Sequence, residues 1–288
     1  MRHFLIRTSD VDGTKAALTN PSEIHHLINV LRFSMGEEVI LLDGNGGKYL
    51  SKICSIHPEK VEFEILSTSQ AGAIRESPLQ LTLAVALVKR QAMDFIVEKA
   101  VEFGVAEIVP LKTERTIVGA THALPLPDHR NQRWQRIIQA AAKQSGQAIL
   151  PVIKPVTDFD KFLEGISGGA MNCAPTFFLT PNHLIPSPSP LPLGERGRVR
   201  GENFAKVLLT ENGRGTALRR RSGQARRAPT EKNCLMIGPE GGWSRQEQEK
   251  AIKFGAIPVR LADNPLRCET AVVAALALLV NLNILKDL

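Results

Sequence analysis

Residues 235–271 read LMIGPEGGWSRQEQEKAIKFGAIPVRLADNPLRCETA, and this stretch decides the fold class. The apolar segment Cys234–Ile237 predicts a strand that runs into the turn Gly238–Gly242, with a helix directly behind the turn. A second apolar segment, Ile257–Leu261, predicts a strand followed by the loop Ala262–Pro265 and a long apolar helix. Strand ends that each lead into a loop and a helix form a ligand crevice at the carboxyl edge of a parallel sheet. The sequence therefore predicts an α/β fold with a site at that edge.

The rest of the chain shows two patterns. Residues 1–73 alternate short strands and turns, which predicts a small β-barrel, and a single helix begins behind Asn20, an N-cap residue followed by Pro21. From residue 74 to 288 strands alternate with helices, which predicts a parallel sheet. Strands are predicted in this second domain at 81–88, 107–111, 176–180, 206–210, 234–237 and 257–261. Helices are predicted at 91–103, at 131–145, behind a capping box at 244–247, and at about 267–285.

One segment breaks this alternation. Residues from about 184 to 203 are Pro-rich and then Arg/Gly-rich, a composition that cannot build a packed core, so we expect a disordered insertion there. The net charge of +7 is concentrated near it: between Arg196 and Arg227 there are nine Arg and one Lys against two Glu. The remainder has 26 basic and 27 acidic residues, so the overall charge says little about a folded RNA-binding face.

Composition excludes several classes of protein. The longest apolar run, Ala271–Val280, is far shorter than the roughly 20 residues of a membrane span, and the N-terminus lacks the apolar region of a signal peptide. Four cysteines show no CxxC spacing, which argues against a metal site and a disulfide framework and fits a reducing, cytoplasmic environment. No Ser-His-Asp arrangement is apparent. We therefore expect no membrane partner and no metal.

The two loops closely resemble the cofactor site of the SPOUT class of knotted RNA methyltransferases. The nearest resemblance is to the ribosomal RNA small subunit methyltransferase E family, which methylates N3 of a uridine in 16S ribosomal RNA. That family carries a GPEGG turn and a Leu-Gly-x-Arg-x-Leu-Arg-x-Glu-Thr-Ala loop. Here residues 261–271 read LADNPLRCETA, with Ala262 in place of the Gly and Asn264-Pro265 in place of the Arg and its neighbour. The Leu-Arg-x-Glu-Thr-Ala half is intact, and the resemblance covers the chain apart from about 184–233.

The resemblance implies a PUA-like β-barrel followed by a SPOUT-type parallel sheet with a C-terminal trefoil knot. The front domain shares the family's His-His-Leu-x-x-Val-Leu-Arg stretch, which begins at His25. The implied cofactor is S-adenosyl-L-methionine, and the implied partners are the small-subunit ribosomal RNA and a second copy in a homodimer. The implied cofactor-binding residues are Leu209, Gly238, Pro239, Glu240, Gly241, Gly242, Leu261, Ala262, Leu266, Thr270 and Ala271.

Catalytic and RNA-binding candidates follow from the same resemblance. Arg267 and Glu269 are the catalytic candidates; a cation at a helix start opposes the helix dipole, which favours a functional reading for Arg267. Helix capping explains Glu269 and Thr270 equally well. The RNA-binding candidates are Arg2, Arg7, His25, His26, Arg32 and Arg115, although each alone is also an ordinary surface residue. The sequence identifies no general base.

Two alternative functions stay open. Related knotted enzymes methylate the ribose 2′-oxygen, and the front domain and the Leu-Arg-x-Glu-Thr-Ala loop argue against that product. A non-catalytic ribosome-assembly factor is favoured only by the altered Asn264-Pro265. Binding of S-adenosylmethionine separates the enzymes from the assembly factor.

Overall fold

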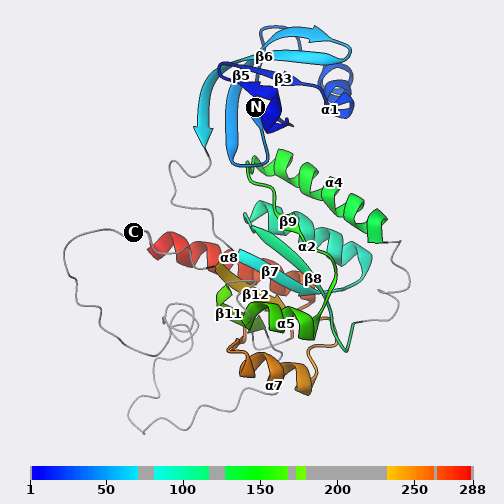
Figure 1. Ribbon diagram of the computed structural model, residues 1–288, viewed down its shortest axis with the longest axis vertical. Helices are drawn as coiled ribbons and strands as arrows, with labels where there is room; N and C mark the ends of the chain where they lie inside the picture. Colours follow the sequence, from blue (N-terminus) through cyan, green and yellow to red (C-terminus); the bar gives the residue numbers. More distant parts are fainter. Residues whose placement is uncertain are drawn as a thin grey trace, which may run out of the picture.

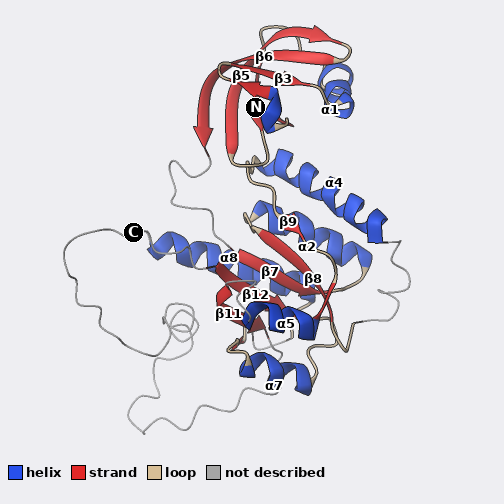
Figure 2. Cartoon of the chain, viewed as in Figure 1, coloured by secondary structure: helices blue, strands red, loops and turns tan. Residues whose placement is uncertain are grey.

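The computed structural model describes residues 2–70, 81–116, 127–167, 173–179, 232–262 and 265–286, which form two sheets with helices (Figures 1 and 2). The predicted strand at 206–210, Leu209 and the predicted insertion lie outside the described residues, as does the boundary predicted between residues 73 and 74. No helix of the described residues is long and apolar enough to cross a membrane.

The front domain is a six-stranded sheet. Its strands are β1 (His3–Leu5), β2 (Val11–Asp12), β3 (Lys15–Leu18), β4 (Glu38–Leu42), β5 (Gly47–His57) and β6 (Lys60–Gln70). They lie in the order β1-β4-β5-β6-β3-β2, and every pair is antiparallel except β1 with β4. Strands β4 and β5 form a hairpin whose turn uses Gly44 and Gly46, both with positive φ. Phe4, Leu41 and Phe63 are buried between the strands.

The front helix differs from the single helix predicted behind Asn20. After a short 3-10 turn, η1 (Thr8–Asp10), and strand β3, the chain forms α1 (Pro21–His25), and the Asn20 side chain accepts a hydrogen bond from the Ser22 amide as expected of an N-cap. The chain then widens into a π-helical turn, η2 (His26–Val30), where the Leu31 amide donates to the His26 carbonyl. That wider spacing is not visible in the apolar pattern, because the same residues face the core in either helix.

The second sheet has seven described strands, and all of their pairings are parallel, which confirms the α/β prediction. The strands are β7 (Leu81–Ala86), β8 (Glu107–Lys112), β9 (Val152–Ile153), β10 (Thr157–Asp158), β11 (Cys173–Leu179), β12 (Lys232–Ile237) and β13 (Ile257–Val259). Their order is β10-β8-β7-β12-β11-β13, with β9 also paired to β8. Strand β12, late in the chain, therefore lies between β7 and β11. Strands β7 and β13 are shorter than predicted.

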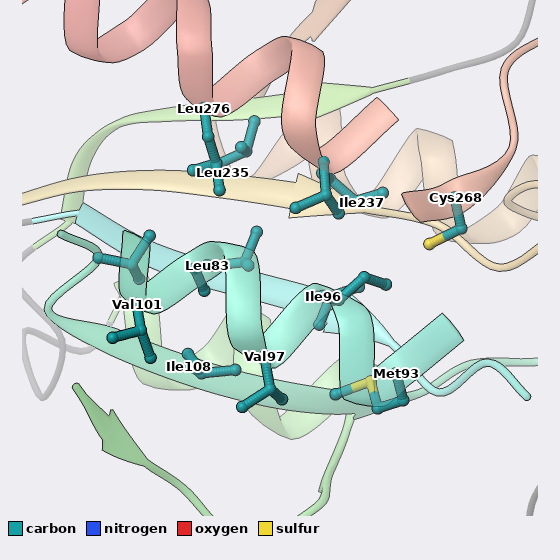
Figure 3. Close-up of a cluster of buried hydrophobic side chains, with 14 of the residues drawn as sticks. Leu83, Met93, Ile96, Val97, Val101, Ile108, Leu235, Ile237, Cys268 and Leu276 are labelled. Carbon is teal, nitrogen blue, oxygen red and sulfur yellow. The ribbon is translucent and has the colours of Figure 1, made fainter. Parts of the chain in front are cut away.

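Helices cover both faces of this sheet (Figure 1). They are α2 (Arg90–Glu102), α4 (Pro127–Ser145), α5 (Phe159–Ser167), α7 (Arg245–Lys253) and α8 (Cys268–Lys286). One core joins the sheet to α2, α4 and α8, and Figure 3 shows Met93 and Cys268 at the same end of this cluster. A second core joins the other face to α5 and α7. Helix α2 ends at Glu102, within one residue of the predicted end, and Gly104 directly behind its C-cap has φ +71.

The front domain is attached to the end of α4. The His3 Nδ1–H donates to the Lys143 carbonyl at 2.7 Å, and the Lys143 ammonium lies 2.7 Å from a Glu23 carboxylate oxygen. The amide of Gly46 donates to the Ala148 carbonyl, and the hairpin turn forms an antiparallel bridge between Asn45 and Ile149. Burial lowers the pKa of His3, with the Lys143 carbonyl opposing that shift. Backbone and side-chain contacts therefore join the two domains directly.

Candidate functional site

Three neighbouring strands end at one level of the second sheet. Leu179, the last residue of β11, is paired with Ile237 of β12 on one side and with Val259 of β13 on the other. Because the strands are parallel, their following loops leave from the same carboxyl edge. The loops 238–244 and 260–267 therefore flank the end of β11, as the sequence predicts for a ligand crevice.

The first loop is a tight turn held by packing. The Gly242 amide donates to the Pro239 carbonyl at 2.8 Å, and Gly242 has φ +68, a conformation that favours glycine. A Cβ on Gly238 would lie 2.8 to 3.0 Å from three atoms of the Trp243 indole, so this position has no room for a side chain. Trp243 is buried, with its ring centroid 5.0 Å from that of Phe159. The glycine at 238 is therefore a packing requirement.

Gly241 has a different environment from Gly238. It is exposed, and a Cβ there would meet only the Arg115 side chain and carbonyl, at 3.5 Å or more. The Arg115 guanidinium donates to the Gly241 carbonyl at 3.0 Å. Arg115, an RNA-binding candidate, thus touches the glycine turn directly.

A buried carboxylate fixes the loop after β8 to the turn. Glu247 completes the predicted capping box of α7: one oxygen accepts from the Ser244 amide, and the Ser244 hydroxyl accepts from the Glu247 amide. Its other oxygen accepts from the Glu114 amide at 2.8 Å. Thr113 and Thr116 close the same loop through their hydroxyls, 2.8 Å apart. These bonds hold Arg115 in place beside the turn.

The start of α8 lies close to the glycine turn. The Arg267 carbonyl accepts the first helical hydrogen bond, from the Ala271 amide, and its side chain is exposed with no hydrogen bond or ion pair to any described residue. The pKa of the neighbouring Cys268 is raised to about 12, mainly by burial, with smaller contributions from the negative charges of Glu269 and Glu240. Since Glu240 belongs to the glycine turn, this coupling brings the two predicted motifs together.

The remaining cofactor candidates are distributed around this edge. Leu261 and Ala262 are half-buried, and the Ala262 carbonyl accepts from the Arg260 guanidinium at 2.9 Å. Leu266 and Thr270 are exposed, whereas Ala271 packs partly against the core. Asn264 lies outside the described residues, so the altered part of the loop is only partly seen.

The other RNA-binding candidates belong to the front domain. Arg2, Arg7, His25 and His26 are exposed, and the His26 ring packs edge-on against Phe4. Arg32, also exposed, lies two residues behind the π-helical turn and has φ +56, which is rare for a residue other than glycine. These five residues belong to the front domain, whereas the glycine turn follows β12 of the second sheet.

Sequence reasoning missed two features of this site. Trp243 was part of the quoted stretch but was not connected with Gly238, although a glycine five residues before a buried tryptophan is compatible with such a contact. The bond from Glu247 to Glu114 joins residues 133 positions apart. The sequence offers one indication of this bond: the capping-box interaction uses one carboxylate oxygen of Glu247, and the second oxygen needs a partner elsewhere. No cluster of three or more His, Cys, Asp or Glu suited to a metal occurs in the described part of the chain.

Comparison with known proteins gives two family matches. The family model described as an RNA methyltransferase domain matches residues 75–181 and 200–280, so residues 182–199 fall between its two matched segments. The family model described as an RNA methyltransferase PUA domain matches residues 18–66.

Individual relatives and structures agree with these matches. A Synechocystis protein named ribosomal RNA small subunit methyltransferase E is 29% identical over 257 residues, which covers 89% of this chain and 70% of the relative. A protein of the same name from Buchnera aphidicola is 26% identical, with 90% and 87% covered. The crystal structure of the Neisseria gonorrhoeae protein of that name, bound to S-adenosyl methionine, superposes with a TM-score of 0.69 at 27% identity, covering 98% of each chain.

Proposed function

The chain belongs to the RNA methyltransferase family, and from that membership we propose that it transfers a methyl group from S-adenosylmethionine to N3 of a uridine in small-subunit ribosomal RNA. The resemblance to the methyltransferase E family is confirmed by its relatives. One observation carries the proposal: the glycine turn and the chain that leads into α8 leave the same carboxyl edge of the sheet, behind the paired ends of β12, β11 and β13.

The residues at this edge fit an S-adenosylmethionine molecule. A ligand with an adenine edge needs backbone donors and acceptors, and Gly241 is an exposed position of the turn at which a ligand can approach the chain. A close approach to the chain at Gly241 meets no Cβ. We propose that the turn Gly238–Gly242, Leu261, Ala262, Leu266, Thr270, Ala271 and, outside the described residues, Leu209 bind the cofactor.

The cofactor supplies a methyl group on a positively charged sulfur. The uridine N3 proton must leave before the nitrogen lone pair attacks, and the negative charge that results spreads onto the uracil oxygens. Arg267 is exposed at the start of α8 and, among the described residues, has no acidic partner, so its guanidinium is available to stabilise that charge. Glu269, in the first turn of the same helix, is the second catalytic candidate. The target uracil must be unstacked from its neighbours, either flipped out of a helix or in a single-stranded region, to reach the methyl donor.

The finer assignments are part of the same proposal. Residues 1–73 form the RNA-binding domain through Arg2, Arg7, His25, His26 and Arg32, and residues 74–288 form the catalytic domain, in which Arg115 adds a contact. The chain around β12 and α8 forms a trefoil knot. The chain acts as a homodimer, supported by the exposed Leu278 on the apolar helix α8, and works in the cytoplasm, where ribosomal RNA is its substrate.

Two measurements test the proposal. Calorimetric titration with S-adenosylmethionine is expected to show saturable binding by the full chain. Unmodified small-subunit ribosomal RNA is then incubated with the protein and the cofactor, digested to nucleosides and analysed for 3-methyluridine. A 2′-O-methylated nucleoside in its place identifies a ribose methyltransferase, and RNA binding without cofactor binding identifies an assembly factor.

A further inference from the structure

Helix α4 has a solvent face of unusual composition. Its buried side carries Trp134, Ile138, Ala141 and Ala142, which pack in the core shared with α2. Four exposed residues lie on the opposite side at spacings of three and four, and we call them the α4 face: Gln132, Gln135, Arg136 and Gln139. Positions three and four apart lie on the same side of a helix, so the four side chains form one continuous surface about 10 Å long.

Most of this helix and the chain behind it lack acidic residues. From Asn131 to Lys154 there is not one Asp or Glu, and the one acidic residue of α4 is Asp128, in its first turn. Arg133, which points toward α2, is paired with the Asp94 carboxylate. The Arg136 guanidinium has no such partner among the described residues. Between Gln132 and Gln139 the α4 face therefore presents one cation and three amide donors, and no carboxylate.

The composition of the α4 face excludes a protein interface of the usual kind. Protein interfaces concentrate aromatic and apolar side chains at their centre, and the α4 face has none. Arginine and amide side chains without neighbouring carboxylates are the groups that contact the phosphates and sugars of nucleic acids.

The position of α4 connects this surface to the rest of the molecule. One end of α4 lies against the front domain, through His3 and Lys143, and the other end extends beyond that domain (Figure 1). The same helix packs on α2, whose first turn lies at the carboxyl edge of the sheet, near the start of α8 (Figure 3).

We propose that the α4 face is an RNA-binding surface that contacts the phosphate backbone between the front domain and the methyl-transfer site. The surface holds RNA without reading its sequence. The proposal rests on the proposed function for the identity of the RNA, and it adds contacts that none of the candidate site residues makes.

Charge substitutions on the α4 face test this surface in the full-length protein. Gln132→Glu places a carboxylate four residues before Arg136, an arrangement that stabilises a helix, so the fold is kept while Arg136 is neutralised. Gln135→Glu adds a negative charge at the centre of the face, and Gln135→Lys adds a positive one. Gln246→Glu, on an exposed position of α7, is the matched control with the same chemical change elsewhere.

Binding is measured by fluorescence anisotropy with unmodified small-subunit ribosomal RNA between 50 and 200 mM salt, concentrations chosen as in the usual analysis of counterion release. We expect the Kd to rise about fivefold for each Glu on the α4 face, to fall for Gln135→Lys and to stay unchanged for Gln246→Glu. Arg136→Ala is expected to lower the salt slope by roughly 0.7 to 0.9. Affinity for S-adenosylmethionine should equal that of the parent in every variant.

The outcomes separate this surface from the proposed function. If Gln135→Glu, Gln135→Lys and Gln246→Glu bind RNA with equal affinity, the α4 face does not bind RNA. This conclusion holds whether or not the parent protein methylates RNA. A change of oligomeric state in the Gln135 variants also overturns the proposed surface, because the face is then a protein interface. If the parent binds RNA through α4 but forms no methylated nucleoside, the surface stands and the proposed function fails.

Discussion

Replacing Gly238 by Ala tests whether packing against Trp243 shapes the cofactor turn. A Cβ at this position would lie 2.8 to 3.0 Å from three indole atoms, whereas carbon atoms in contact are ordinarily about 3.5 to 4.0 Å apart. The indole must therefore move by roughly half an ångström or more. It is buried against Phe159, so it cannot swing into solvent. Overpacking of this kind costs about 1 to 3 kcal/mol.

One effect works against that cost. Gly238 does not have a positive φ, so alanine fits its backbone conformation. Alanine also lowers the conformational entropy of the unfolded chain, which raises the free energy of unfolding by about 0.4 to 1 kcal/mol. The free energy of unfolding should therefore fall by about 1 to 2 kcal/mol. Urea denaturation monitored by tryptophan fluorescence measures this change, and titration calorimetry should show weaker binding of S-adenosylmethionine because the turn is displaced.

Two further variants make the reasoning refutable. In Gly241→Ala the new Cβ meets Arg115 at an ordinary 3.5 Å, so stability should stay within about 0.5 kcal/mol of the parent while cofactor affinity drops. Combining Gly238→Ala with Trp243→Phe shrinks the ring and should recover part of the lost stability. The packing argument is refuted if Gly238→Ala unfolds at the parental free energy, or if the two substitutions are strictly additive.

Three other predictions concern separate features. Arg267→Lys should keep cofactor affinity but lower single-turnover methyl transfer about a hundredfold, since an ammonium lacks the planar fork of the guanidinium; a parental rate removes Arg267 from the reaction. With a pKa of about 12, the Cys268 thiol is protonated at pH 8, so iodoacetamide followed by mass spectrometry should modify exposed Cys54 and spare Cys268 in the folded protein, and equal labelling contradicts the burial. Deleting Pro186–Gly201 should leave the Tm and methyl transfer nearly unchanged, and a large loss of either shows that the segment packs on the core.

Local features of the fold were predictable from the sequence because neighbouring residues produce them. The capping box at Ser244–Glu247, the Asn20 cap and the end of α2 at Gly104 each depend on a few consecutive residues. The parallel sheet followed from strands alternating with helices. The glycine turn and the loop behind β13 were predicted to share one edge, since consecutive parallel strands end on the same side.

Other features depend on contacts between distant residues. The sequence of β12 does not indicate that it pairs with both β7 and β11. All three strands are largely apolar, and nothing in their sequences specifies which strands are neighbours. The bonds from Arg115 to Gly241 and from His3 to Lys143 join residues 126 and 140 positions apart. The π-helical turn before Arg32 keeps the same residues inside as an α-helix does, so periodicity could not reveal it.

The contact between the front hairpin and the chain behind α4 has a consequence for substrate choice. The Asn45–Ile149 bridge lies three residues before β9, so the front domain is bonded almost directly to the central sheet. These contacts then set the spacing between the front domain and the methyl-transfer edge of the sheet. If RNA spans both, only a molecule whose anchoring point and target uridine are separated by the matching distance engages both ends at once. Short fragments carry one end only, so selectivity becomes a matter of three-dimensional spacing in the folded subunit as well as of the nucleotides around the target.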